Sequence, residues 1–162
     1  MRTDVQLRRA TEADLPELLG HVRALHELER LERADAEREA ALRPLLGDSD
    51  MGRIYLLRVG PRTIGYVALG FGYSIEFGGR DAYVDELFLQ PAYRGQGIGR
   101  RVLQLLRREA AALGLHALHL EVARDNEPAQ RLYRSAGFEL RARYCLMSAR
   151  LDTDAQPDPQ DP

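Results

Sequence analysis

The sequence feature that most constrains the fold is a glycine-rich turn at residues 90–101. An apolar run at 87–89, typical of the end of a strand, precedes it, and residues 102–113 follow with helical spacing of apolar side chains. Glycines at alternate positions permit left-handed backbone conformations and leave amides uncovered; they are Gly95, Gly97 and Gly99. The turn therefore predicts an α/β chain that binds an anion, most naturally a phosphate, where a helix begins.

Two common nucleotide-binding motifs do not fit this turn. Arg100 stands where a dinucleotide fingerprint would have its third glycine. A P-loop requires a lysine, and all 23 basic residues counted as Lys+Arg are arginines. Nucleotide binding of either kind is therefore disfavoured.

Composition predicts a cytoplasmic protein of one domain. The 162 residues suffice for one good core, and no apolar run approaches the roughly 20 residues of a membrane helix. Charged residues interrupt the N-terminal region, so it does not resemble a signal peptide, and the single Cys145 cannot form an internal disulfide. A net charge of −2 argues against nucleic acid as the main partner.

Apolar periodicity and turn residues predict the order of elements. Before the glycine turn we expect a strand at 4–9, a helix from a cap at 11–14 to about residue 29, a loop and exposed helix at 31–46, a hairpin of strands 53–59 and 63–72, a flexible connection at 73–80 and a strand at 81–89. After it we expect a helix ending before Gly114, a parallel strand at 115–122, a helix capped by Asn126, and strands at 138–140 and 143–151. Residues 152–162 have the acidic, proline-rich composition of a disordered tail.

Two segments together resemble the GNAT N-acetyltransferases. Residues 87–99 are similar to the acyl-CoA loop of that family, in which Arg/Gln-x-x-Gly-x-Gly/Ala follows a strand. Residues 126–138 are similar to the family pattern Asn-x-x-Ala-x-x-x-Tyr-x-x-x-Gly-Phe, one helix and one strand later. The predicted order β-α-α-β-β-β-α-β-α-β-β also matches. The resemblance implies a single GNAT domain over residues 1–151, with a mixed central sheet flanked by helices.

The resemblance implies acetyl transfer from acetyl-CoA to an amine. In the family a strand N–H, here that of Leu87, faces the acetyl carbonyl, and the residue at Leu89 pairs with the pantetheine arm, with Phe88 between them. Tyr133 matches the tyrosine that protonates the departing thiolate, although spacing alone would also fit a core tyrosine. Asn126 caps its helix and would in addition contact CoA. The amides that would hold the pyrophosphate are those of Arg94, Gly95, Gln96, Gly97, Ile98, Gly99 and Arg100.

The base is expected among two consecutive acids, Asp85 and Glu86, in an otherwise apolar strand. Alternation predicts that they point to opposite faces, and burial would raise the pKa of a carboxyl toward that of a useful base. A salt bridge to one of the many arginines is the structural alternative. The histone-acetyltransferase branch places its base at a position that is Tyr83 here, so that assignment does not transfer.

The likeness is closer to the diamine (spermidine/spermine) acetyltransferases, which have consecutive acids and the same Asn-Glu-Pro helix start. It implies that Asp85 and Glu86 bind the amine, with Glu86 as a water-mediated base. Glu29 and Glu32 match acids which that branch recruits for polycations, but a solvated charged face at 27–39 is the better explanation of this segment.

The remaining expectations concern metals, partners and the acceptor. His26 is expected on the apolar face of the first helix, no histidine pair has a third partner at metal-ligand spacing, and no metal is predicted. The acceptor is expected to be a small-molecule primary amine: a polyamine, a diamine or an amino-acid side chain. A homodimer is implied by the family alone. Alternatives are a protein, peptide or aminoglycoside acceptor, or a non-catalytic CoA-binding regulatory module.

Overall fold

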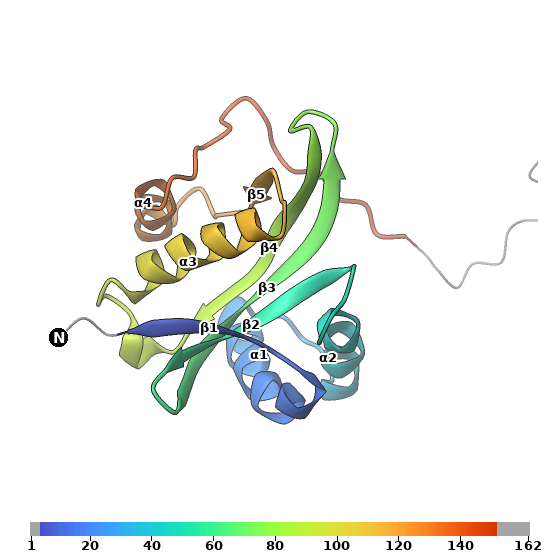
Figure 1. Cartoon of the computed structure of the whole chain (residues 1–162), viewed down its shortest axis with the longest axis vertical. Helices are drawn as coiled ribbons and strands as arrows, with labels where there is room; N and C mark the ends of the chain where they lie inside the picture. The colour runs from blue at the N-terminus through green and yellow to red at the C-terminus, as the bar shows by residue number, and fades with distance from the viewer. Residues whose placement is uncertain (1–3, 152–162) are drawn as a thin grey trace, which may run out of the picture.

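The computed structural model describes residues 4–151, in which helices cover both faces of one five-stranded sheet (Figure 1). The strands lie in sequence order, β1-β2-β3-β4-β5. No helix in this part of the chain has the length and apolar character needed to cross a membrane. The elements are β1 Val5–Arg9, α1 Leu15–Glu29, α2 Asp35–Leu42, β2 Gly52–Val59, β3 Arg62–Ser74, β4 Gly79–Leu89, α3 Ile98–Ala112, β5 Ala117–His119 and α4 Glu127–Ser135.

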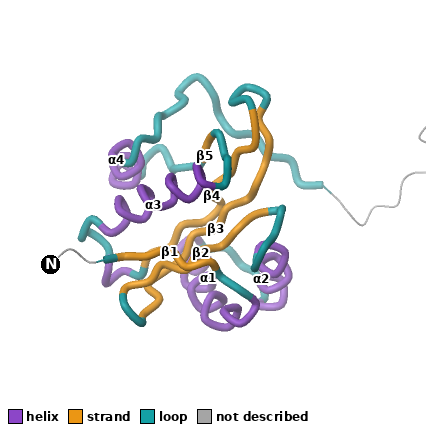
Figure 2. The backbone as a smooth tube through the Cα atoms, in the orientation of Figure 1, coloured by secondary structure: helices purple, strands orange, loops and turns teal. Residues whose placement is uncertain are grey.

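The two faces of the sheet carry separate apolar clusters. Helices α1 and α2 pack on one face and α3 on the other, with α4 beside α3 (Figures 1 and 2). Because side chains alternate along a strand, β3 sends Tyr66 and Ala68 toward α1 and Val67 and Leu69 toward α3. The sheet is therefore buried on both sides near its centre, which makes it a rigid support for residues at its edges.

The predicted cap begins a short 3-10 turn, Glu12–Asp14, which leads directly into α1. The backbone N–H of Thr11 donates to Asp14 at 2.8 Å, and the two residues form a capping box. Asp14 also accepts two bonds from the Arg8 guanidinium, at 2.6 and 3.0 Å. The helix ends at Arg30, which takes a left-handed conformation with φ of 56°. Both ends of α1 are thus determined by local signals.

Strands β4 and β5 separate after a short pairing. They are parallel, as expected for strands joined by a helix, and pair through 81–83 and 117–119. Beyond Tyr83 no described residue pairs with β4 on that side, whereas β3 pairs with the opposite edge as far as Leu89. One edge of β4 from 84 to 89 is therefore free to bind another extended group.

A β-bulge interrupts β4 at Asp85. Ala68 pairs with Glu86 and Leu69 with Val84, which leaves Asp85 as the extra residue. Val84 packs in the α3 cluster, whereas Glu86 contacts α1 on the other face. In a regular strand, residues two positions apart would lie on the same face. Regular alternation along this strand is therefore interrupted at the bulge, and the prediction that Asp85 and Glu86 point to opposite faces stays a prediction.

The C-terminal strand predictions are also wrong. The strand expected at 115–122 is limited to β5, and neither 138–140 nor 143–151 forms a strand. An apolar pattern is a local signal, but a strand needs a neighbouring backbone to pair with, and β5 ends at His119. Five large apolar side chains of this segment are exposed: Leu140, Tyr144, Leu146, Met147 and Leu151.

The flexible connection predicted at 73–80 is shorter than expected, because β3 continues to Ser74 and β4 begins at Gly79. The predicted tail at 152–162 lies outside the described residues.

Candidate active site

The glycine turn presents a row of free amides at the start of α3. Gly95 and Gly97 have φ of 71° and 76°, conformations that residues with a side chain rarely adopt, and Gly97 is the N-cap of α3. Within residues 4–151, the amides of 95–100 donate no hydrogen bond. A Cβ built on Gly97 would meet nothing within 4 Å, so the space in front of the turn is open. The turn can therefore bind a pyrophosphate through backbone N–H groups and the positive end of the α3 dipole.

The open edge of β4 leads directly to this turn. The Phe88 carbonyl lies against Gly65 of β3, and the Gln90 N–H donates to Ile64 at 2.9 Å. Since successive residues direct their backbone groups to alternate edges, Leu87 and Leu89 face away from β3. The Leu89 carbonyl accepts a bond of 2.8 Å from Arg94, which agrees with this direction. The Leu87 N–H is thus available in the gap between β4 and β5.

Glu86 is held by two donors on the α1 face of the sheet. Tyr66 donates from its hydroxyl to Oε2 at 2.6 Å, and Nε2 of His26 lies 2.7 Å from Oε1. The Tyr66 side chain is fully buried and His26 is nearly so, whereas Glu86 is partly exposed. Each carboxylate oxygen keeps a lone pair for a water or an amine. The structural alternative, an arginine salt bridge to Glu86, is not present among the described residues.

Two further carboxyls share the electrostatic environment of Glu86. Partial burial, followed by the charge of Glu86, raises the pKa of both Asp85 and Glu29. For Asp85 the charge of Glu121 adds to the same effect. Such an accumulation of negative charge favours a cationic ligand, and a raised pKa brings a carboxyl closer to the range of a useful base.

Tyr133 of α4 lies half-buried near the same charges. Burial raises the pKa of its phenol, and the negative charge of Glu29 raises it further. The phenol is therefore protonated at neutral pH and can donate. Asn126 caps α4 by accepting a bond of 3.2 Å from the Ala129 N–H, as predicted. Phe138 packs edge-on against Tyr133, with ring centroids 6.0 Å apart.

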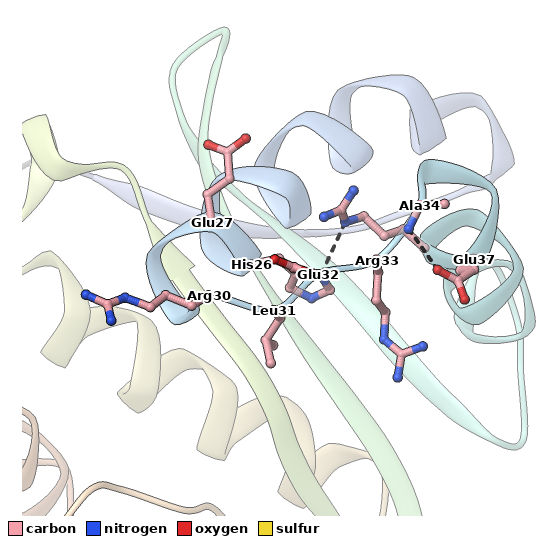
Figure 3. Close-up of a pocket in the computed structure, with 9 residues that line it drawn as sticks. His26, Glu27, Arg30, Leu31, Glu32, Arg33, Ala34 and Glu37 are labelled. Atoms are coloured by element: carbon pink, nitrogen blue, oxygen red, sulfur yellow. Dashed lines mark hydrogen bonds between the residues drawn. The ribbon is translucent and has the colours of Figure 1, made fainter.

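A cavity of about 640 Å³ lies between the end of α1 and the start of α2 (Figure 3). Its walls include acids and arginines in equal number, and the side chains of Glu27 on α1 and of Arg30 and Arg33 after it point in different directions (Figure 3). Glu32 also lines it, whereas Asp85, Glu86, Glu29 and Tyr133 do not. His26 lines this cavity and also contacts Glu86, so the cavity lies beside the candidate site.

Of the four histidines, one is a functional candidate and three are structural. His21 packs against Phe88, with ring centroids 5.9 Å apart. His119 pairs with Asp81 at 3.1 Å and His116 contacts the Phe77 carbonyl at 3.2 Å, both near the tip of the β3–β4 hairpin. Within the described residues, no group of three or more His, Cys, Asp or Glu is arranged to hold a metal ion.

Sequence reasoning missed three residues around Glu86. For His26 the sequence predicts only a place on the apolar face of the first helix, and no pattern in the sequence distinguishes Tyr66 or Arg38. His26 is 60 residues from Glu86 and Tyr66 is 20 residues away, and no local pattern connects them. The only available signal was a polar His26 on the apolar face of α1.

Comparison with known proteins identifies the family. The sequence matches the acetyltransferase (GNAT) family over residues 19–138. The chain belongs to the GNAT acetyltransferase family. It is 31% identical over 142 residues to thialysine N-epsilon-acetyltransferase from Bos taurus, covering 82% of this chain and 83% of the bovine protein. This GNAT chain is therefore an acetyl-CoA-dependent N-acetyltransferase, and the likeness is consistent with the diamine-type branch.

Solved structures agree on the fold. An integron cassette protein from the Cole Harbour Salt Marsh metagenome has a TM-score of 0.79 and 32% identity, over 91% of both chains. An aminoglycoside N-acetyltransferase crystallised with CoA has a TM-score of 0.76 over 93% of this chain and 98% of its own. Its identity is 16%, so it supports the fold alone. The predicted single-domain α/β fold with a mixed sheet is confirmed.

Proposed function

We propose that this GNAT enzyme acetylates the primary amine of a small molecule by direct attack in a ternary complex with acetyl-CoA. The observation that supports this most is the group of three carboxyls, Asp85, Glu86 and Glu29, whose charges act on one another, together with the phenol of Tyr133, whose pKa the charge of Glu29 raises. Negative charge attracts a protonated amine, and the phenol can donate a proton to the departing thiolate.

The chain supplies the groups that acyl transfer requires. Acetyl-CoA, when bound, provides the thioester that the amine attacks. The Leu87 N–H would donate to the carbonyl oxygen as negative charge develops there, at little reorganisation cost because the strand fixes it. Amides of the glycine turn would hold the pyrophosphate, and Leu89 would pair with the pantetheine arm. Tyr133 would give its proton to the departing sulfur.

We assign the role of base to Glu86, acting through a water, and amine binding to Asp85 and Glu29. Glu86 is oriented by two donors and keeps free lone pairs, whereas the other two carboxyls are more exposed. Glu86→Gln should therefore lower kcat by about 10²-fold, and Asp85→Asn should mainly raise KM for the amine. A larger kcat loss in Asp85→Asn than in Glu86→Gln would move the base to Asp85, whose raised pKa suits that role.

For the acceptor we favour an amino acid with a side-chain amine. The cavity beside His26 carries Arg30 and Arg33 together with Glu27 and Glu32, and such a lining suits a molecule with both an ammonium and a carboxylate. Thialysine, after which the bovine relative is named, is of this kind. A polyamine is the second candidate, supported by the three carboxyls.

The test is thiol release from acetyl-CoA with thialysine, lysine, spermidine, putrescine, an aminoglycoside and a basic peptide. We expect turnover on the small amines, with thialysine or lysine preferred over the polyamines. Preference for the peptide or aminoglycoside would contradict the acceptor class. Tight CoA binding without turnover on any amine would favour a non-catalytic regulatory module. The homodimer and the cytoplasmic location stay predictions.

A further inference from the structure

A chain of buried polar contacts connects helix α2 to Glu86. Arg38 of α2 donates from Nε to Nδ1 of His26 at 3.3 Å, the dashed line at His26 in Figure 3. On its other side, Nε2 of His26 lies 2.7 Å from Glu86 Oε1. His26 and Arg38 are only 7% and 8% exposed. Buried polar groups at these positions would be costly without such partners, so the contacts are well defined.

The chemistry of the partners decides which nitrogen of His26 carries the proton. A guanidinium has N–H donors and no acceptor, so Nδ1 of His26 must accept with its lone pair. A neutral imidazole then has its one proton on Nε2, which donates to Glu86. With Tyr66 donating to the other oxygen at 2.6 Å, Glu86 accepts one fixed bond on each oxygen. These two bonds fix the orientation of the carboxyl group.

We propose that Arg38 and His26 are positioning residues for the acceptor side of the reaction, with Arg38 fixing His26 as the Nε2–H tautomer and His26 holding Glu86. The proposal depends on the proposed function, in which Glu86 receives the proton of the amine. Without the donor of Arg38, only Glu86 favours the Nε2–H tautomer, and part of the population can carry its proton on Nδ1 instead. In that part Nε2 cannot donate to Glu86, which is then held by Tyr66 alone and is less firmly oriented.

The chain offers a matched control in Arg23. Asp35 accepts a bond of 2.8 Å from Arg38 and one of 2.6 Å from Arg23, which is exposed on α1. Arg23 therefore attaches α2 to α1 through Asp35, whereas the bond between Arg38 and Asp35 lies within α2, and of the two arginines only Arg38 contacts His26. Arg23→Met should report the effect of loosening α2, and Arg38→Met should add the effect on His26.

Steady-state kinetics test the positioning role. Arg38→Met should lower kcat/KM for the amine on the order of tenfold while KM for acetyl-CoA is unchanged, and Arg23→Met should stay within about twofold of the wild type. His26→Gln gives a second background, because its amide N–H can donate to Glu86 and has no tautomer. When Arg38→Met is added to His26→Gln, kcat/KM for the amine should fall by less than about twofold. Equal losses in the two arginine variants, or an undiminished loss in the His26→Gln background, would overturn the proposal.

Long-range proton–nitrogen NMR of the histidine rings tests the tautomer without any turnover. In the wild type we expect His26 to be protonated on Nε2 only, and in Arg38→Met to show protonation of Nδ1. Should Arg38→Met fail to fold, the wild-type spectrum still decides, because a proton on Nδ1 there contradicts the proposal. Absence of turnover in the wild type would reject the proposed function, whereas the wrong tautomer in an active enzyme would reject only the positioning role.

Discussion

Tyr133 is the residue whose role can be separated most clearly from binding. Its pKa is raised by burial and by the charge of Glu29, so the phenol is protonated when a thiolate leaves. Tyr133→Phe keeps the ring that packs on Phe138 and removes only the proton donor. We expect kcat to fall by about 10²-fold with acetyl-CoA affinity nearly unchanged. A large loss of binding, measured by calorimetry, would contradict the role of general acid.

Asp14 gives a prediction about stability and pH. The Arg8 guanidinium lowers the pKa of Asp14 to about 2, below the usual value of about 3.9 in unfolded chains. Because the folded pKa is lowered, this stabilisation is complete above the unfolded pKa and is lost as pH falls toward 2.

Asp14→Asn should therefore reduce the free energy of unfolding by about 1 kcal/mol at pH 7. The difference from the wild type should shrink between about pH 4 and pH 2, as followed by urea unfolding at several pH values. A difference that is independent of pH would mean that the charge of Asp14 does not contribute.

At the level of elements, the glycine turn and helix α3 form the anion site together. Gly97→Val would place a β-branched residue at φ of 76° and a side chain in the open space before the amides. We expect acetyl-CoA affinity to fall by roughly tenfold or more, because the phosphate-binding amides are blocked. The kcat at saturating acetyl-CoA should change less.

A glycine outside the turn provides the control. Gly20 lies within α1, has no positive φ, and a Cβ there would meet nothing within 4 Å. Gly20→Ala should stabilise the protein by about 0.5–1 kcal/mol and leave acetyl-CoA affinity unchanged. Normal acetyl-CoA binding by a folded Gly97→Val would show that the pyrophosphate lies elsewhere.

At the level of the whole molecule, acetyl-CoA should stabilise the folded state by mass action. A ligand that binds only the folded chain at about 100 times its Kd adds about 2.7 kcal/mol, which for a domain of this size raises Tm by several degrees. Differential scanning fluorimetry with CoA, and with free phosphate as control, measures the shift. The shift should be lost in Gly97→Val and kept in Tyr133→Phe. No shift at any CoA concentration would contradict CoA binding by this fold.

The sequence by itself determined those parts of the protein that depend on neighbouring residues. The caps at Thr11 and Asn126, the bounds of α1 and α3, and the strand-turn-helix at 87–100 follow from spacing and from the conformational freedom of glycine. The same kind of signal indicated the family, because each GNAT motif is a short, continuous stretch of sequence. The acids of β4 were found in the same way, as polar residues in an apolar strand.

Only the tertiary structure decided how the acids are presented. The bulge at Asp85 arises from the register of β4 against β3, and it turns Glu86 toward α1, where His26 and Tyr66 lie far from it in sequence. The early end of β5 likewise depends on backbone pairing, and it leaves 138–151 without the strands that its apolar pattern predicted. Pairing and burial join distant residues, so no local pattern can contain them.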